Sequence, residues 1–278
     1  MPTQKTKETG KGNRMKIGLI GCGNMGSAIL KGILAAGAFK PTELIASAQS
    51  EGTRNKIKNE YNITLADSNQ DVVRLADIVF LAVKPHCYAE VIAGIKDLVR
   101  RDQMFVSMAP GKSLAWLEQC FEKEVKLMRM MPNTPAMVKE GMTAYCVNER
   151  VEAQEKEKAA KICGYFGRAE EVDEALMDVV TSVSGSSPAY VFMFIEAMAD
   201  AAVADGMPRA KAYTFAAQSV LGSAKMVLET GMHPAVLKDM VCSPGGTTIE
   251  AVRVLEEKGM RSSVIEAMKA CVHKAKGM

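Results

Sequence analysis

Residues 15–26 read MKIGLIGCGNMG, and this stretch constrains the fold more than any other part of the chain. Gly21, Gly23 and Gly26 follow an apolar run expected to be a strand and open a stretch expected to be a helix. In such a unit the first glycine allows a tight turn, the second lets a pyrophosphate approach the backbone, and the third allows close packing of helix and strand. The free N–H groups at the helix start favour phosphate binding. The sequence therefore predicts a dinucleotide-binding turn, and the alternative is a glycine turn used only for packing.

Short apolar runs alternate with amphipathic stretches from Met15 onward. Six runs are expected to be strands: Lys16–Ile20, Glu43–Ala46, Asp77–Val83, Met104–Ser107, Val125–Met130 and Thr143–Val147. Helical periodicity marks Met25–Ala36, Tyr88–Leu98 and Ser113–Phe121. This alternation predicts an α/β domain over residues 15–175, with a Rossmann-like, doubly wound parallel sheet and helices on both faces.

The pattern changes after Glu174, where no strand-like run follows. Helical segments are expected at 176–182, 187–205, 208–230, 234–241, 247–258 and 261–275, which predicts a C-terminal all-helical domain over residues 176–278. The segment 187–205 is apolar or small on almost every side, so it requires burial all round. Its charges at Glu196, Asp200 and Asp205 argue against a simple membrane helix. We expect it to lie in a dimer interface, and the alternative is the central core helix of a monomer.

The composition of the 278 residues excludes several classes of protein. A formal net charge of +3 is too small to favour nucleic acid binding. The seven cysteines form no C-x-x-C pair and only three histidines are present, so we expect no metal site. Unpaired cysteines are typical of a reducing compartment. The polar residues 1–14 are predicted to be a disordered extension and neither a signal peptide nor a membrane span. These features together predict a cytoplasmic protein that binds no membrane.

The end of the second expected strand bears on the choice of cofactor. An acidic residue at this position would bind the ribose 2′-hydroxyl of NAD and repel a 2′-phosphate. Here residues 47–50 read SAQS and are neutral, and Arg54 follows one helical turn later. These residues favour NADP(H). Glu51 lies close enough to keep NAD(H) as an alternative.

Three other strand ends are candidates for the cofactor crevice, because ligands of such sheets bind at the carboxyl ends of the strands. Lys84 ends the strand of FLAVKPH and is expected near a phosphate or the nicotinamide, or else is a solvated loop lysine. The small residues of Ser107–Gly111 (SMAPG) would let the backbone lie against the cofactor. Met131–Pro135 (MPNTP) is a rigid polar turn whose Asn133 and Thr134 are equally consistent with a structural role.

Two polar segments of the helical half are expected to open helices. In Cys242–Glu250 (CSPGGTTIE), Thr247 and Thr248 are expected to cap a helix whose free N–H groups can bind a carboxylate. Val183–Tyr190 (VSGSSPAY) is the second such segment. Together they suggest a small anionic substrate, and the alternative is plain N-capping.

From Met15 onward, the chain resembles the pyrroline-5-carboxylate reductases. The resemblance rests on six motifs in order: IGCGNMG at 20–26, FLAVKPH at 80–86, MPNTP at 131–135, VSGSSPAY at 183–190, DGMPR at 205–209 and LKDMVCSPGGTTIEA at 237–251. The resemblance implies reduction of 1-pyrroline-5-carboxylate to L-proline with NAD(P)H, the last step of proline biosynthesis. It also implies a homodimer that can assemble into a larger ring.

The resemblance further implies a set of site residues. The cofactor would contact Ile20, Gly21, Cys22, Gly23, Asn24, Met25, Ser47, Asn69, Ala82, Val83, Lys84, Pro85, Met108, Ala109 and Pro110. The substrate would contact Glu174, Ser184, Gly246, Thr247 and Thr248. Three positions depart from the pattern of the family or of some members. Ser187 replaces a glycine, Ala48 stands where some members have a serine, and Met240 stands where some have an asparagine.

We expect Thr248 to be the catalytic residue, because its hydroxyl can hydrogen-bond to the ring nitrogen of the substrate. A cyclic imine can accept its proton from solvent, so catalysis would depend mainly on positioning. A β-hydroxyacid dehydrogenase is the nearest rival, but it needs a helix lysine soon after the serine–glycine segment. Here the first lysine after Ser184 is Lys211. A non-catalytic sensor that binds NAD(P) is the rival from another class.

Overall fold

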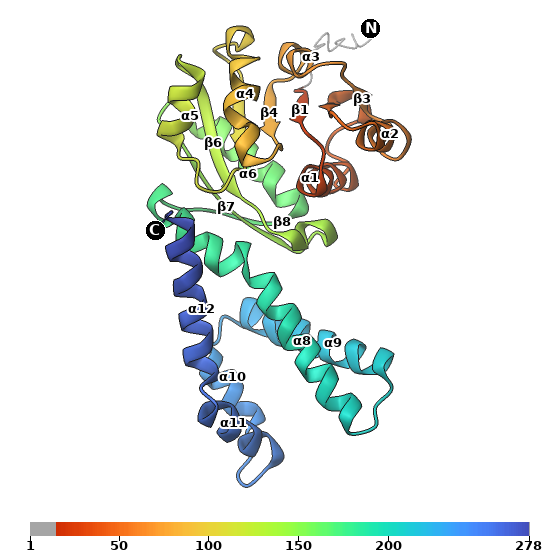
Figure 1. The fold of residues 1–278 in the computed structure, drawn as a ribbon, viewed down its shortest axis with the longest axis vertical. Coiled ribbons are helices and arrows are strands. Elements are labelled where there is room, and N and C mark those ends of the chain that lie inside the picture. Colours follow the sequence, from red (N-terminus) through yellow and green to blue (C-terminus); the bar gives the residue numbers. More distant parts are fainter. Residues whose placement is uncertain (1–14, 278) are drawn as a thin grey trace, which may run out of the picture. The chain divides into compact units, whose positions relative to one another are not determined.

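The computed structural model describes residues 15–277, and the predicted extension over residues 1–14 lies outside the described part. The chain divides into two compact units, one ending at Met177 and one beginning at Asp178. Figure 1 shows an α/β unit followed by a helical one.

The first unit is built on an eight-stranded sheet with the order β3-β2-β1-β4-β5-β6-β7-β8. The strands are β1 (Ile17–Ile20), β2 (Leu44–Ser47), β3 (Thr64–Leu65), β4 (Ile78–Leu81), β5 (Met104–Ser107), β6 (Lys126–Met131), β7 (Gly141–Val147) and β8 (Gly167–Glu171). The helices are α1 (Asn24–Ala35), α2 (Glu51–Asn59), α3 (Asn69–Leu75), α4 (Tyr88–Ala93), α5 (Leu114–Phe121) and α6 (Ala153–Cys163). The order β3-β2-β1-β4-β5 is that of a Rossmann sheet and agrees with the predicted fold class.

Helices cover both faces of this sheet. Leu19 of β1 belongs to a buried cluster with Ile29 of α1 and with residues of α6. The neighbouring Gly18 points the other way, where an added Cβ would lie 2.5 Å from the Val72 side chain of α3. On that second face the rings of Phe105 and Phe121 pack 4.9 Å apart. Because β1, β2, β4 and β5 are buried along their whole length, their near-continuous apolar sequences suit a sheet covered on both sides.

The sheet is parallel, as predicted, except at one pair, where β7 runs antiparallel to β6. The reason is the short connection through a 3₁₀ helix at Thr134–Val138, which leaves no room for the crossover that parallel pairing needs. β7 then pairs in parallel with β8. The sequence patterns also missed β3, which has two residues, and β8, whose sequence GRAEE is polar and half exposed.

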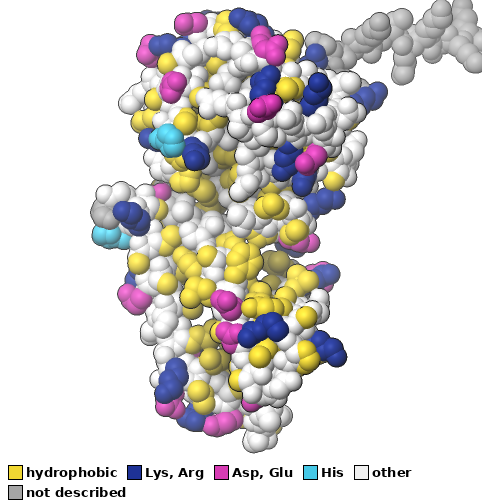
Figure 2. Space-filling view, turned by 45° about the vertical axis from the view of Figure 1, so that its right-hand side comes forward, with side chains coloured by type: hydrophobic (Ala, Val, Ile, Leu, Met, Phe, Trp, Pro, Cys, Tyr) yellow, Lys and Arg dark blue, Asp and Glu magenta, His cyan; other side chains and the backbone are white. Residues whose placement is uncertain are grey.

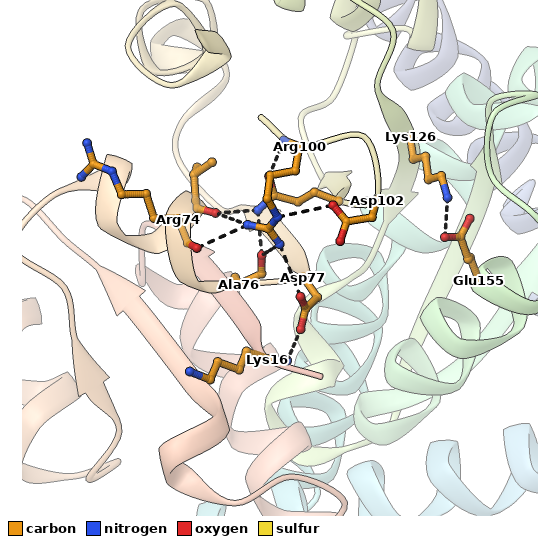
Figure 3. A network of polar contacts seen from close by, with 10 residues as sticks. Lys16, Arg74, Ala76, Asp77, Arg100, Asp102, Lys126 and Glu155 are labelled. Carbon is orange, nitrogen blue, oxygen red and sulfur yellow. Dashed lines mark hydrogen bonds and ion pairs between the residues drawn. The ribbon is translucent and has the colours of Figure 1, made fainter. Parts of the chain in front are cut away.

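A polar network fixes the amino-terminal end of the sheet (Figure 3). The Arg100 guanidinium donates to the carbonyl oxygens of Val73 at 3.1 Å and Ala76 at 3.0 Å. It also lies 3.4 Å from Asp77, whose other carboxylate oxygen accepts from the Lys16 N–H at 2.7 Å. These bonds pair backbone groups that directly precede β1 and β4, at the end of these strands opposite the glycine turn.

The second unit is helical throughout its described residues, as predicted. A short helix, α7 (Met177–Val180), leads across the boundary into a π-helical turn, η7 (Thr181–Gly185). The longer helices are α8 (Ser187–Ala204), α9 (Arg209–Thr230), α10 (Pro234–Val241), α11 (Thr247–Glu257) and α12 (Met260–Ala275). The predicted stop and restart between α8 and α9 is present, with Pro208 as the N-cap of α9.

Large apolar side chains lie exposed on this helical unit (Figure 2). In α8 only Pro188 and Ala199 are buried, whereas Phe192 is 62% and Met193 69% exposed. Phe215 of α9 is 66% exposed. No part of the chain within residues 15–277 covers these side chains, and exposed apolar side chains gathered on one unit are typical of an interaction surface.

One described helical stretch, Glu174–Ala204, is long and apolar enough to cross a membrane by length and composition alone, with a mean hydropathy of 1.2. Only 11% of its most apolar window is buried within the chain. The charged residues Glu196 and Asp200 lie in this stretch. Their presence favours a protein partner over lipid as the cover of α8.

Candidate active site

A cleft of about 430 Å³ opens at the carboxyl ends of β1, β2 and β4. Its lining contains Gly21, Cys22, Gly23, Ala48, Gln49, Ser50, Thr53, Asn69, Ala82, Val83, Lys84, His86, Cys87 and Val91. Seven of the predicted cofactor residues are therefore brought together, namely Gly21–Gly23 after β1, Ala82–Lys84 after β4, and Asn69 at the start of α3. Sequence reasoning did not select Thr53, His86, Cys87 or Val91 as cofactor residues, and of these only His86 belongs to a motif, FLAVKPH.

The glycine turn has the backbone geometry that the sequence predicts. Gly21 has a φ of +90°, and a Cβ there would lie 2.8 Å from the carbonyl oxygen of Ala82. A Cβ on Gly26 would lie 2.9 Å from the carbonyl oxygen of Gly21. At Gly23 no atom lies within 4 Å of the Cβ position. The first and third glycines are thus required by packing, whereas the second borders open space on the cleft.

The helix that follows the turn begins without a side-chain cap. Gly23 is the N-cap of α1, and its first turn contains no acidic residue. Burial raises the pKa of the Cys22 thiol above its usual range, so this side chain is neutral at physiological pH. The uncapped N–H groups and the absence of negative charge suit the binding of an anion.

Ser47 and Asn69 connect the turn to the next strand end. The Ser47 hydroxyl donates to Asn69 Oδ1 at 2.7 Å, and the Ser47 carbonyl accepts from the Gly21 N–H at 3.0 Å. Ser47 is 4% exposed and does not line the cleft, whereas Asn69 does. In this arrangement Ser47 holds the turn and orients Asn69.

Neutral residues line the cleft at the end of β2. Ser50 caps α2 by accepting from the Thr53 N–H at 3.3 Å. Arg54 donates to the carbonyl oxygen of Ala48 at 3.4 Å and lies 3.6 Å from Asp67. Because the Asp67 side chain is 95% exposed, this ion pair is weak. The positive charge of the Arg54 guanidinium at the edge of the cleft is therefore not neutralised.

The remaining predicted cofactor residues do not line the cleft. Ile20 is fully buried in β1, and Asn24 and Met25 form the first turn of α1. Pro85 begins a 3₁₀ helix at Pro85–Cys87. Met108, Ala109 and Pro110 follow the end of β5. Asn133 has a structural role, because its Oδ1 accepts from the Met142 N–H at 2.9 Å.

Glu174 takes part in a partly buried polar cluster of the first unit. Its Oε1 accepts from the Leu114 N–H at 2.7 Å and from Arg129 Nη1 at 2.9 Å. Arg129 is 5% exposed, and its Nε has no hydrogen-bond partner among the described residues. Opposite Arg129 in the β6–β7 register is Cys146, where burial raises the pKa to about 12 and keeps the thiol neutral. Sequence reasoning missed Arg129, although a charge inside the apolar run KLMRMM was a visible signal.

The loop before α11 differs from its prediction in one respect. The N-cap is Gly246, and no side chain caps the helix, so the expectation that Thr247 and Thr248 are the capping residues is wrong. Gly246 has the extended backbone of an N-cap, which places the two threonines inside the first turn. A Cβ on Gly246 would lie 2.4 Å from the Ser243 hydroxyl oxygen. The first N–H groups of α11 therefore remain without a side-chain acceptor, as anion binding requires.

The segment Val183–Tyr190 opens a helix, as predicted, because α8 begins at Ser187 with Ser186 as its N-cap, but no side chain caps it and a π-turn precedes it. The turn η7 is π-helical, and the Ser186 N–H bonds to the Thr181 carbonyl oxygen at 2.8 Å. The longer hydrogen-bonded turn lets the chain continue into α8 although Pro188 lacks an N–H. The Ser184 hydroxyl donates to the Val180 carbonyl oxygen at 3.2 Å. Such π-turns occur frequently at functional sites.

The C-terminal helix holds this turn in place. The Ser182 hydroxyl, which is buried, donates to the carbonyl oxygen of Met268 in α12 at 3.0 Å. The Cys271 thiol lies 3.3 Å from the Ser186 hydroxyl oxygen. Contacts of Ser182 and Ser186 with α12 thus hold the turn before and after Ser184. Ser184 lies in the same unit as Gly246, Thr247 and Thr248.

Two sequence families match the chain. Residues 174–278 match the family described as pyrroline-5-carboxylate reductase dimerisation. Residues 16–111 match the family described as NADP oxidoreductase coenzyme F420-dependent.

Known proteins match over nearly the whole chain. The pyrroline-5-carboxylate reductase of Escherichia coli (strain K12) is 53% identical over 260 residues, covering 94% of this chain and 97% of the relative. That of Methanosarcina acetivorans is 42% identical, covering 91% and 94%.

Solved structures agree with the sequence relatives. A pyrroline-5-carboxylate reductase from Coxiella burnetii superposes with a TM-score of 0.89 at 34% identity, covering 95% of this chain and 98% of that one. A Plasmodium falciparum pyrroline carboxylate reductase with NADP bound gives a TM-score of 0.86 at 33% identity, covering 95% and 97%.

Proposed function

The chain belongs to the pyrroline-5-carboxylate reductase family, and from this membership we propose that it reduces 1-pyrroline-5-carboxylate to L-proline with NAD(P)H, the last step of proline biosynthesis. The observation that carries the proposal is the glycine turn, where Gly23 borders open space beside an uncapped helix start. A helical unit with a second uncapped helix start, at Gly246, supports the substrate side.

The residues of the cleft fit a nicotinamide dinucleotide. A Cβ at position 23 would occupy the open side of the turn, and the uncapped start of α1 provides N–H donors for the pyrophosphate. We assign the pyrophosphate to Ile20–Met25 and the adenosine side to Ser47 and Asn69. Ala82–Pro85 and Met108–Pro110 then line the nicotinamide side. When bound, the nicotinamide supplies the hydride.

We propose NADP(H) as the preferred cofactor and NAD(H) as the weaker one. The cleft at the end of β2 is lined by Ala48, Gln49, Ser50 and Thr53, none of which is acidic. The Arg54 guanidinium lies beside Ala48 and would attract a 2′-phosphate. Glu51 is exposed and is not part of the lining, so it opposes the phosphate only at a distance.

The substrate carboxylate is assigned to the start of α11. Free N–H groups after Gly246 can bind it, and the only acidic residue of the first turn, Glu250, is held by the Arg253 guanidinium at 2.8 Å. Thr247, Thr248 and Ser184 complete the substrate residues of this unit. Glu174, which already binds Arg129 and Leu114, is proposed to border the substrate through the remainder of its carboxylate.

Reduction of the cyclic imine adds a hydride to C5 and a proton to the ring nitrogen. A protonated imine accepts hydride more readily, and this proton can come from solvent. We propose that the Thr248 hydroxyl hydrogen-bonds to the ring nitrogen while the loop N–H groups hold the carboxylate. The contribution of the chain is then to orient C5 and to stabilise the bound geometry.

The Thr248→Val variant tests this assignment. We expect kcat/KM for 1-pyrroline-5-carboxylate to fall about tenfold or more, the effect of losing a contact of roughly 1.4 kcal/mol. Steady-state kinetics at saturating NADPH measure it. Thr214→Val is the matched control, because the Thr214 hydroxyl bonds within α9 to the Ala210 carbonyl oxygen. Unchanged kinetics in Thr248→Val would reject the role.

The reaction itself is tested by following the absorbance of NADPH and, in parallel, of NADH after 1-pyrroline-5-carboxylate is added. We expect turnover with both and a higher kcat/KM with NADPH. Cofactor binding without turnover would favour a non-catalytic sensor. A higher kcat/KM with NADH would contradict the proposed cofactor preference while leaving the reaction intact.

We propose that the working enzyme is a homodimer in the cytoplasm, with dimers able to assemble into a larger ring. Residues 174–278 match a dimerisation family, and they contain the exposed apolar side chains of α8 and α9. A second copy provides the cover that these helices lack in one chain.

A further inference from the structure

The ends of β4 and β5 determine where the proposed nicotinamide side begins. Leu81 and Ser107 are the last paired residues of these two parallel strands. Beyond them the chain leaves the sheet as Ala82–Pro85 on one side and Met108–Pro110 on the other. Because ladder hydrogen bonds end at this pair, another contact is needed to keep the two departing segments at a fixed separation.

Tyr88 provides that contact. It is the first residue of α4 and is completely buried. Its hydroxyl donates to the Leu81 carbonyl oxygen at 2.5 Å and accepts from the Met108 N–H at 3.1 Å. The phenol therefore joins the last paired residue of β4 to the first residue beyond β5.

The bridge is stable against pH. Burial raises the pKa of Tyr88 to about 12, so the hydroxyl keeps its proton and remains a donor at physiological pH. The other buried groups close to it are uncharged, namely Ser107 and the backbone of Met108 and Ala109. The bridge thus consists of two neutral hydrogen bonds in a site from which water is excluded.

Such a bridge is not a general feature of buried tyrosines in this protein. Tyr61 is also buried, with 6% of its surface exposed. Its hydroxyl has no hydrogen-bond partner among residues 15–277. Burial of a phenol therefore does not by itself produce such a link. The link between two strand ends is what distinguishes Tyr88 from Tyr61.

We propose that Tyr88 is a positioning residue for hydride transfer, whose hydroxyl fixes Ala82–Pro85 and Met108–Pro110 relative to each other and so sets the location of the nicotinamide. This inference rests on the proposed function, which assigns these two segments to the nicotinamide side. Ala82, Val83 and Lys84 line the cofactor cleft directly. Tyr88 does not line the cleft, and it acts on these residues through its hydrogen bond to the carbonyl oxygen of the adjacent Leu81.

The Tyr88→Phe variant removes the bridge and keeps the ring that fills the core. It leaves the Leu81 carbonyl and the Met108 N–H without their partner, so the two segments are free to separate. The pyrophosphate and adenosine contacts belong to the glycine turn and to the end of β2, which Tyr88 does not touch. The loss is therefore confined to the nicotinamide end of the cofactor.

The experiment compares Tyr88→Phe with the unaltered enzyme and with the control Tyr61→Phe in the full-length chain. Steady-state kinetics with NADPH and with NADPH deuterated at the transferred position give kcat and its isotope effect. We expect kcat to fall about tenfold or more, and the isotope effect to rise, because misplacement of the reacting atoms slows the hydride step itself. Titrations with NADPH and with 2′-phospho-ADP-ribose, which lacks the nicotinamide, give the two affinities. We expect only the NADPH affinity to fall.

Equal losses of affinity for NADPH and for the nicotinamide-free fragment would overturn the proposal, because they would indicate general loosening of the cleft. An unchanged kcat and isotope effect would overturn it as well. Tyr61→Phe should match the unaltered enzyme in every measurement. If the unaltered enzyme fails to reduce the imine, the proposed function fails, and the comparison of the two affinities still decides whether Tyr88 positions the nicotinamide.

Discussion

We expect the Gly21→Ala substitution to lower the free energy of unfolding by about 3 kcal/mol and to remove most of the affinity for the dinucleotide. Gly21 has a φ of +90°, which L-residues rarely adopt. Its new Cβ would lie 2.8 Å from the Ala82 carbonyl oxygen and 2.9 Å from the Val83 side chain. Relief of these contacts must move the turn away from the end of β4. Urea denaturation and a titration with NADPH measure the two losses.

Gly23→Ala is the matched comparison, because the same methyl group is added two residues away. No atom lies within 4 Å of that position and the φ of Gly23 is −69°, so the free energy of unfolding should change little. The cofactor affinity should fall, since the methyl group occupies the open side of the turn. If Gly23→Ala binds NADPH normally, the pyrophosphate does not approach this glycine and the assignment of the turn is wrong.

The Arg129→Met variant is expected to destabilise the first unit by about 3 kcal/mol, because breaking a buried ion pair leaves one charge uncompensated. Arg129 is 5% exposed, and its Nη1 lies 2.9 Å from Glu174 Oε1. The Glu174 side chain is 32% exposed, so water solvates part of its charge when the arginine is removed. The expected loss of stability is therefore at the lower end of the range for buried ion pairs. The drop in free energy of unfolding is read from urea denaturation.

A double-variant cycle separates the pair from other effects of the arginine. Adding Glu174→Gln to Arg129→Met removes the stranded charge and keeps an acceptor for the Leu114 N–H, so most of the lost stability should return. Arg74→Met is the control, since Arg74 forms an exposed ion pair with Asp71 and should cost less than about 1 kcal/mol. Equal losses in the Arg129 and Arg74 variants would show that burial of the pair is unimportant.

Much of the first unit could be predicted because its signals are local. The predicted strands at Lys16–Ile20 and Met104–Ser107 are observed as β1 and β5 with little or no shift. Their apolar runs specify burial on both faces, and the glycines after β1 specify the turn. By contrast, GRAEE of β8 is a strand only because β7 offers it a partner. No periodicity within those five residues indicates this pairing.

The errors of prediction share one cause, which is that alternative local structures have similar sequence signals. Ser, Gly and Pro in Val183–Tyr190 predicted the start of α8 but not the π-turn before it, which is held by the Ser182 hydroxyl bonded to Met268 of α12. At α11 either a threonine or Gly246 could have been the N-cap. The close approach of Gly246 to Ser243 selects the glycine, and only the folded loop reveals that approach.

The sequence by itself determined the dinucleotide turn, the two-part organisation and the family, because these depend on residue types at short and fixed spacings. The turn at Gly21–Gly26 requires glycine for reasons that hold within a single strand–helix unit. Only the tertiary structure decided which groups meet across the sheet. Tyr88 joins Leu81 to Met108, which lies 20 residues beyond Tyr88, and Arg129 meets Glu174, which lies 45 residues further along the chain. Such contacts depend on strand order and register, which no local pattern within a single strand indicates.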